Sequence, residues 1–470
     1  MKKTSIAVAC LLAIGASGSA LADSSSDVNA LKQQMAAMQA QMQQQMQQMQ
    51  DKINTLTASQ AQTQAEVQTQ AAKASEGGLS TTIGGAEVTL YGMADVSLDS
   101  GSNGKQHVSQ ASSNESYLGV RGQRDLGSSG LRAIFQIETM ADLSDTPGVA
   151  SSLASRNSFA GLEGSFGRVA IGKNDTPYKR ATAAMDPFAG SLGDYNSVMG
   201  NSAGEGRTEF DYRMPHSVFY DSPNFGGFTV NALFSPGQKL NDLTSAGNNE
   251  FPQGELVCSG AQQPSLNGAT PNGNVCNDGA FKNAASTSLT YENGPFLATA
   301  AWELHHDVNR TSDAHGVIAD ESAAKIGATY SFGFGNKLSG IYERLRRDDV
   351  NPAFNERSRN GYYLSDVQEL GRGVDLMGAW AHADQTPGSP KFPGLDDQVD
   401  MYSIGLKYHF DKHTSVYVLG AYLTQGAGAH YGLGAGEGHG TPILSPRTNG
   451  GGPLPGQTLS AVSTGIQYEF

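Results

Sequence analysis

The chain contains few of the features that mark helical membrane proteins and nucleic-acid-binding proteins. Of its 470 residues only 3 are Cys and 2 are Trp, and 16% are charged, against about 25% in ordinary globular domains. After the first two dozen residues it has no uninterrupted apolar run of about 20 residues, which excludes membrane-spanning helices. The 31 basic and 45 acidic residues give a net charge of −14. Because nucleic-acid-binding proteins carry a basic surface, we expect no nucleic-acid partner.

Glycine is the residue that the chain has in excess. There are 58 Gly among 470 residues, a fraction of about 12% against a usual 7%, while 38% of the chain is hydrophobic. A glycine-rich chain with little charge and moderate hydrophobicity is typical of β proteins. Hydropathy alone does not distinguish a soluble β protein from a transmembrane β-barrel, because alternating barrel strands average out.

The first 22 residues have the order of features of a secretory signal peptide. Lys2 and Lys3 precede a short apolar run, and the A-x-A sequence 20–22 provides a cleavage site. Cleavage would remove Cys10 and leave Cys258 and Cys276, which we predict to form a loop disulfide in an oxidising compartment. Their separation, with no nearby His, does not fit a zinc site, and we expect no metal and no cofactor.

Residues 23–78 differ sharply in composition from the rest. They are rich in Gln, Ala and Met, and apolar or small residues recur at steps of three and four from Val28 to Val67. This spacing predicts a short α-helical coiled coil with one stutter between Met42 and Met46. A Gln-rich disordered segment is the alternative. We interpret residues 79–87 as a linker.

From residue 88 to residue 470 the pattern changes to period-two alternation interrupted by Gly-containing turns. Short links alternate with long ones, of which the longest are 175–207, 236–283 and 426–457. This is the pattern of an outer-membrane β-barrel, with short turns on one side and long loops on the other. We predict sixteen strands, near 88–98, 115–123, 130–139, 155–163, 167–174, 208–221, 226–235, 284–292, 295–304, 322–332, 336–347, 359–368, 373–384, 399–410, 413–425 and 458–470. His305, His306 and His315 then fall in a loop, where we expect them to be solvated.

Several short motifs resemble the opening strands of general porins from Gram-negative outer membranes. They are Val88–Gly92 (VTLYG), Gly119–Gly122 (GVRG), Asp125–Gly127 (DLG), Phe135–Glu138 (FQIE), Ser155–Leu162 (SRNSFAGL), Gly164–Gly167 (GSFG), Thr176–Tyr178 (TPY) and Asp186–Phe188 (DPF). The resemblance is dense over about 88–190, sparse in the middle, and returns in the last strand, which ends at Phe470. It implies an all-β fold, a sixteen-stranded antiparallel transmembrane barrel that forms a homotrimer.

The same resemblance implies a water-filled channel narrowed by the third long loop, here 175–207, with acidic groups on the loop facing basic groups on the wall. Asp186 and Asp194 are the acidic candidates. Arg156 matches the position of a wall arginine in related porins, and Arg207 and Arg213 are further basic candidates. Tyr117 stands where many relatives have Arg, which puts simple anion selectivity in doubt and suggests stacking on a solute. Phe470 would be the signal read by the barrel-assembly machinery.

We therefore predict an outer-membrane porin for passive diffusion of small hydrophilic solutes and ions, with its N-terminal segment in the periplasm. No catalytic constellation is evident, so we expect no enzyme. Expected partners are outer-membrane lipid and lipopolysaccharide, the barrel-assembly machinery and, through the coiled coil, peptidoglycan. Two alternatives remain open. One is a solute-selective channel, for example for small carboxylates, and the other is an envelope-tethering or adhesion protein that uses the barrel as an anchor.

Overall fold

The computed structural model describes residues 79–127, 130–144, 153–200, 210–236, 281–309, 318–348, 357–387, 396–434 and 455–470, together with Gln47. The predicted signal peptide 1–22, the predicted coiled coil 23–78 (apart from Gln47), Arg207, Cys258 and Cys276 lie outside the described residues. All the elements given below belong to one compact unit, Gly77–Phe470. Among the described residues, no helix has the length and apolar character needed to cross a membrane.

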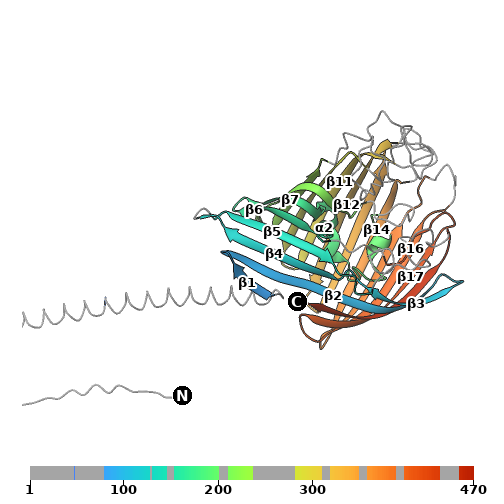
Figure 1. Ribbon diagram of the computed structural model, residues 1–470. Coiled ribbons are helices and arrows are strands. Elements are labelled where there is room, and N and C mark those ends of the chain that lie inside the picture. Colours follow the sequence, from blue (N-terminus) through green and yellow to red (C-terminus); the bar gives the residue numbers. More distant parts are fainter. Residues whose placement is uncertain are drawn as a thin grey trace, which may run out of the picture. The chain divides into compact units, whose positions relative to one another are not determined.

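The described residues form a single antiparallel sheet with a few short helices (Figure 1). The strands are β1 (Leu79–Ile83), β2 (Ala86–Ser102), β3 (His107–Ser113), β4 (Tyr117–Asp125), β5 (Arg132–Met140), β6 (Ser158–Gly164), β7 (Gly167–Asp175), β8 (Arg213–Asp221), β9 (Phe228–Ser235), β10 (Asn283–Asn293), β11 (Phe296–Asn309), β12 (Ile318–Phe332), β13 (Asn336–Arg347), β14 (Arg359–Gly371), β15 (Val374–Ala383), β16 (Val399–His409), β17 (Thr414–Gln425) and β18 (Leu459–Glu469). The helices are α2 (Pro177–Thr182) and the 3₁₀ helices η2 (Ala183–Met185) and η3 (Tyr195–Ser197).

The sheet closes into a barrel with sixteen strand positions, as predicted. Closure comes from the pairing of β18 with β2, where Ser460 lies opposite Ser102 and Glu469 opposite Met93. The eighteen strands occupy sixteen positions because β3 and β4 both pair with β2, one after the other along its length. The remaining strand, β1, pairs only with the start of β2 as a short hairpin. It lies within residues 79–87, which the sequence indicated as a linker.

Alternation along each strand separates an inner from an outer face. In β16, Met401 and Ser403 are buried. Tyr402 and Ile404, which alternate with them along the strand, are exposed, Ile404 to 63%. Exposed apolar side chains recur in this way on nearly every strand. Since lipid-facing and lumen-facing residues alternate in a transmembrane barrel, the exposed set forms the lipid-facing surface.

Aromatic residues mark the two edges of this lipid-facing surface. Near the long loops, strands β13 to β17 carry five aromatic residues on the same face. Tyr342 lies opposite Tyr362, and Trp380, Tyr402 and Tyr422 are in register with one another on the next three strands. Near the short turns a second row includes Phe296, Tyr330, Phe332, Phe334, Tyr408, Phe410 and Tyr468. Two aromatic girdles flanking an apolar band are the signature of an outer-membrane barrel, and they place the long loops at the opposite membrane surface from the short turns.

Candidate functional site: the loop inside the barrel

The connection between β7 and β8 folds into the barrel. We call its described residues, 176–200 and 210–212, the inner loop. It starts with Thr176, whose Oγ1 accepts a hydrogen bond from the Lys179 backbone N–H at 3.2 Å, and with Pro177 in the first turn of α2. A capping Thr followed by Pro is a strong helix start. The helix packs against β10, β11 and β12 through Tyr178, whose ring is fully buried.

Apolar side chains of the inner loop pack against one side of the barrel wall. Met185, Phe188, Leu192, Tyr195, Val198 and Met199 form one core with inward-facing residues of β13 to β18. Glycines on the wall make room for them: a Cβ at Gly327 would lie 2.8 Å from the Met185 sulfur, and one at Gly405 would lie 3.2 Å from the Phe188 ring. The loop is therefore attached to the wall as a layer, with one side facing the strands and the other facing the lumen.

Polar contacts fix the same attachment. The Tyr363 hydroxyl donates to Asp186 at 2.8 Å, and Glu343 accepts hydrogen bonds at 2.8 Å from the Tyr178 hydroxyl and the Gly200 N–H. Buried Lys325 pairs with buried Asp211. A second long loop contributes too, since the Gly434 N–H donates to the carbonyl of Leu192 at 3.2 Å and Tyr431 and Leu433 are fully buried in the shared core.

The two predicted acidic residues of the loop are both buried, and Asp186 contacts the wall through the Tyr363 hydroxyl. Asp186 accepts hydrogen bonds from the backbone N–H groups of Phe188 and Tyr195, both at 2.9 Å. Asp194 accepts them from Gly190 and Asn196, at 2.7 and 2.8 Å. Their side chains hold the turns of the loop, and Asp186 and Asp194 are only 7% and 3% exposed.

Burial also changes the acidity of these carboxyls. Loss of solvation raises the pKa of Asp186 to about 6. It raises the pKa of Asp194 to about 8, with the nearby charges of Asp186 and Glu115 acting in the same direction. Both groups therefore bind protons more readily in the folded loop than a solvated aspartate does.

The lumen-facing side of the loop has a different composition. Ala183, Ala184 and Ala189 are exposed there, and Lys179 and Arg180 keep 26% and 29% of their side chains exposed. Within the described stretch 176–200, the two carboxylates are both buried. The charge that this stretch presents to water is accordingly positive.

A network of charges lies where the loop leaves β7. Asp175 contacts Lys179 at 3.4 Å and Arg213 at 3.2 Å, and it accepts a hydrogen bond from Asn157 Nδ2 at 2.9 Å. Arg156 lies 3.7 Å from Glu115 and 3.8 Å from Glu138. The structure thus brings two of the predicted basic residues, Arg156 and Arg213, into one network on the wall. Carboxylates from the same wall belong to this network.

Tyr117 supports Arg156. The Arg156 guanidinium lies over the Tyr117 ring, 4.8 Å from its centroid, and the ring makes an edge contact with Tyr91 at 6.2 Å. A cation held on an aromatic face is stabilised by the ring quadrupole. Arg121 lies over Tyr91 at 5.0 Å in the same way, forming a second cation–aromatic pair on the inner wall.

Asp221 joins the loop to the wall at a second charged contact. Its carboxylate pairs with Arg180 of α2 at 2.6 Å and with Arg168 of β7. Arg168 also lies over the rings of Phe159 and Phe219, at 5.3 and 5.7 Å. One carboxylate thus serves two guanidinium groups, which leaves a local excess of positive charge.

Sequence reasoning missed Lys179, Arg180, Asp175 and Glu115. The sequence does contain a signal for the first three, because Thr176-Pro177 predicts a helix start, and Asp175 and Lys179 are then an i,i+4 pair. Nothing in the sequence indicates that Glu115 lies beside Arg156, because that contact depends on the break between β3 and β4.

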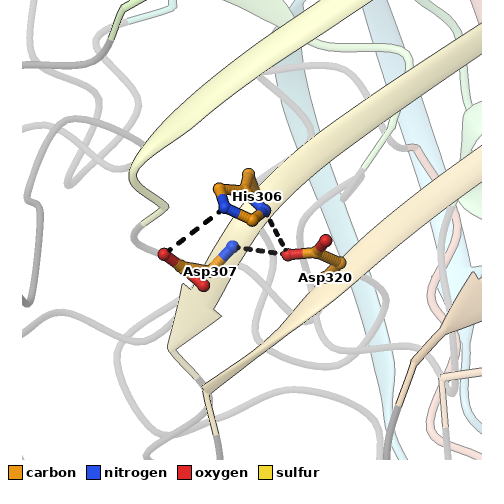
Figure 2. A group of neighbouring side chains, drawn as sticks. All are labelled: His306, Asp307 and Asp320. Atoms are coloured by element: carbon orange, nitrogen blue, oxygen red, sulfur yellow. Dashed lines mark hydrogen bonds and ion pairs between the residues drawn. The ribbon is translucent and has the colours of Figure 1, made fainter. Parts of the chain in front are cut away.

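A histidine pair at the long-loop end of β11 also differs from the prediction. His305 is buried, and its ring stacks between Phe210 and Phe281 at 4.8 and 4.6 Å, so the prediction that it is solvated was wrong. His306 lies between two carboxylates (Figure 2): Nδ1 is 2.6 Å from Asp320, and Nε2 is 3.6 Å from Asp307. His306 and Asp307 belong to β11 and Asp320 to β12, so the contact of Nδ1 with Asp320 links the two strands.

A closed antiparallel barrel with two aromatic girdles and a charged loop folded against its inner wall defines an outer-membrane diffusion channel. Residues 7–428 match the family model described as Gram-negative porin, and the chain belongs to that family. It is 23% identical to the outer membrane porin protein 32 of Delftia acidovorans over 391 residues, 82% of this chain and 94% of that protein. It is 28% identical to the major outer membrane protein P.IA of Neisseria meningitidis serogroup C over 334 residues, 67% of this chain and 77% of that protein.

Solved porins have the same fold. An anion-selective porin from Comamonas acidovorans superimposes with a TM-score of 0.61 at 21% identity, covering 82% of this chain and all of that one. The OmpT protein of Vibrio cholerae, solved in a trimer form, gives a TM-score of 0.50 at 16% identity, covering 82% of this chain and 99% of that one. The protein is thus an outer-membrane porin whose water-filled channel serves passive diffusion of small hydrophilic solutes and ions.

Proposed function

We propose that this porin favours small anions, and that it does so as a homotrimer without covalent chemistry. The proposal depends on the inner loop, which leaves the side chains of Lys179 and Arg180 partly exposed and buries those of Asp186 and Asp194. In a narrow channel with low-dielectric walls, the sign of the lining charge sets which ions are concentrated.

The wall next to the attachment of the inner loop supports the same preference. Arg156, Arg213 and Arg168 are each partly exposed, and Glu138, Asp175 and Asp221 beside them have only 10%, 16% and 14% of their side chains exposed. Glu115, at 34%, is the most exposed carboxylate of the network and reduces the preference without reversing it. Small carboxylates, the solutes suggested by the sequence, are among the anions that such a lining would accept.

Other parts of the proposal rest on relatives. The trimer form solved for the Vibrio cholerae protein supports a trimer here. The roles of Phe470 as an assembly signal and of residues 23–78 as a periplasmic coiled coil that reaches peptidoglycan remain proposals. The family is one of diffusion channels, which supports a role without catalysis.

The test is the reversal potential of single trimers in a planar bilayer under a KCl gradient. We expect the wild type to pass chloride more readily than potassium. The double substitution Lys179→Gln/Arg180→Gln should lower the chloride-to-potassium permeability ratio by at least about twofold, because it removes the charges exposed on the loop.

Lys412→Gln is the matched control, since it removes a positive charge at an exposed short turn outside the lumen. It should leave the ratio unchanged. A wild type that prefers potassium, or a loop variant with the wild-type ratio, would contradict the proposal.

A further inference from the structure

Three side chains of the kinds that bind metal ions meet at the long-loop end of β11 and β12 (Figure 2). They are His306 and Asp307 of β11 and Asp320 of β12. Their donor atoms, one from each side chain, all lie within 4.8 Å of one another. Within the described part of the chain, no other set of three His, Cys, Asp or Glu side chains brings its donor atoms this close.

A β-bulge brings these residues together. Successive residues of a regular strand point to opposite faces of the sheet, so His306 and Asp307 would not normally face the same neighbour. The register between β11 and β12 shifts between His305 and Val308, and Asp307 has a φ of 54°. As a result, Asp320 contacts the His306 ring and also accepts a hydrogen bond from the Asp307 backbone N–H at 2.9 Å. Bulges often re-aim a side chain in this way.

The imidazole of His306 lies between the two carboxylates. Nδ1 is 2.6 Å from an oxygen of Asp320, and Nε2 is 3.6 Å from an oxygen of Asp307. Each of the three side chains is between 33% and 37% exposed, so water and ions reach them. A zinc ion lies about 2.1 Å from its nitrogen and oxygen ligands. Rotation of these partly exposed side chains therefore suffices to place one ring nitrogen and two carboxylate oxygens around a single ion.

The charge of the cluster favours a cation. The two carboxylates carry two negative charges, and within the described residues the ammonium of Lys282, 3.3 Å from Asp307, is the one basic group besides His306 that contacts them. With the imidazole neutral, as in a metal ligand, one negative charge is left over. A divalent ion supplies the missing counter-charge, and an imidazole with two carboxylates is a donor set that first-row metals such as zinc accept.

We propose that His306, Asp307 and Asp320 bind a divalent first-row metal ion. The ion replaces the direct contact between Nδ1 and Asp320 and ties the end of β11 to the start of β12. Three protein ligands leave a coordination position for water, as in other zinc sites that are open to solvent. The proposal goes beyond passive diffusion and does not depend on the ion preference of the channel, since neither Lys179 nor Arg180 belongs to the cluster.

The experiment titrates Zn²⁺ into the purified, metal-free trimer in detergent and measures the heat of binding. We expect saturable binding by the wild type. His306→Asn and Asp320→Asn should each weaken binding at one site per subunit by on the order of tenfold or more, because each removes a ligand. His409→Asn is the matched control: the His409 side chain is 38% exposed, much like that of His306, but it lies 3.0 Å from a single carboxylate, that of Asp375. Its substitution should leave Zn²⁺ binding unchanged.

Two further measurements identify the site. Cu²⁺ bound to an imidazole shows nitrogen couplings in its electron paramagnetic resonance spectrum, and those of one site should disappear in His306→Asn and remain in His409→Asn. In the wild type, Zn²⁺ should slow hydrogen exchange at residues 303–309 and 318–322, because ligands that bind only the folded state stabilise it.

Three results would overturn the proposal. One is a wild type without saturable Zn²⁺ binding. Another is wild-type Zn²⁺ affinity in folded His306→Asn or Asp320→Asn, or an equal loss in His409→Asn. The third is unchanged hydrogen exchange at residues 303–309 and 318–322 when Zn²⁺ is bound.

Discussion

At the scale of single residues, the two buried aspartates show how one residue type can take opposite roles. An aspartate that faces a lumen carries a fixed negative charge that acts on the passing ions. Asp186 and Asp194 are buried instead, and their oxygens accept backbone hydrogen bonds that close the turns of the inner loop. Asp186 and Asp194 therefore act by holding the inner loop in its position.

This role predicts a pH dependence. Because the pKa of Asp194 in the folded loop is raised to about 8 and that of Asp186 to about 6, the folded state binds more protons than the unfolded state between the ordinary carboxyl pKa, about 4, and these values. The stabilisation is fully present below pH 4 and is lost as the pH rises through about 6 and about 8. Hydrogen exchange of residues 186–199 should therefore become faster from pH 5 to pH 9, after correction for intrinsic exchange.

Asp194→Asn should flatten the upper part of this pH profile. It should also cost about 1–3 kcal/mol of loop stability, since an amide offers only one acceptor for the N–H groups of Gly190 and Asn196. Ser97→Ala is the control, because it removes a polar group from the inward face of β2, outside the inner loop. An Asp194→Asn protein that keeps the full pH dependence would rule out these carboxyls as its source.

At the scale of elements, we expect the contact between the inner loop and β12 to set the width of the lumen. A Cβ at Gly327 would lie 2.8 Å from the Met185 sulfur and 3.1 Å from Thr182 Cγ2. We expect a leucine side chain there to displace this part of the loop toward the lumen. Gly327→Leu should thus reduce single-channel conductance, by roughly a quarter or more, because pore diameter limits conduction.

The matched control is Gly378→Leu on β15, where nothing lies within 4 Å of the added Cβ. It should conduct like the wild type. If Gly327→Leu also conducts like the wild type, then the inner loop does not form the narrowest part of the channel.

The elements themselves were largely predictable, and the reason is the alternation of β-strands. The predicted strand 336–347 coincides with β13, and most of the others agree within a few residues. The strand β3 was missed because its Ser-rich sequence, HVSQASS, lacks apolar alternation. The orientation of Asp186 could not be predicted, since it depends on Tyr363, a residue 177 positions away.

At the scale of the whole molecule, Phe470 takes part in the closure of the barrel. Phe470 exchanges backbone hydrogen bonds with Gly92 at 2.9 and 3.0 Å. A Cβ at Gly92 would lie 2.7 Å from the Phe470 ring and 2.6 Å from the Tyr117 carbonyl oxygen. Only glycine leaves room for the ring at this junction.

Gly92→Ala should therefore destabilise the closed barrel by about 1–3 kcal/mol, as expected for overpacking. The measurement is the temperature at which the folded barrel converts to the unfolded form on a semi-native gel. Gly340→Ala, where the nearest atom is 3.8 Å from the new Cβ, should leave that temperature unchanged. An equal temperature for Gly92→Ala would mean that the terminal ring can move aside without cost.

The seam between β2 and β18 has a further consequence for how the protein is made. It joins residues 93–102 to residues 460–469, so the hydrogen bonds that complete the ring require the chain to have been translated as far as these residues. Until then both edge strands expose unpaired backbone groups, which invite aggregation. A nascent chain of this kind gains from being kept unfolded during its export, and a stop codon before residue 460 would leave an open sheet instead of a slightly shorter channel.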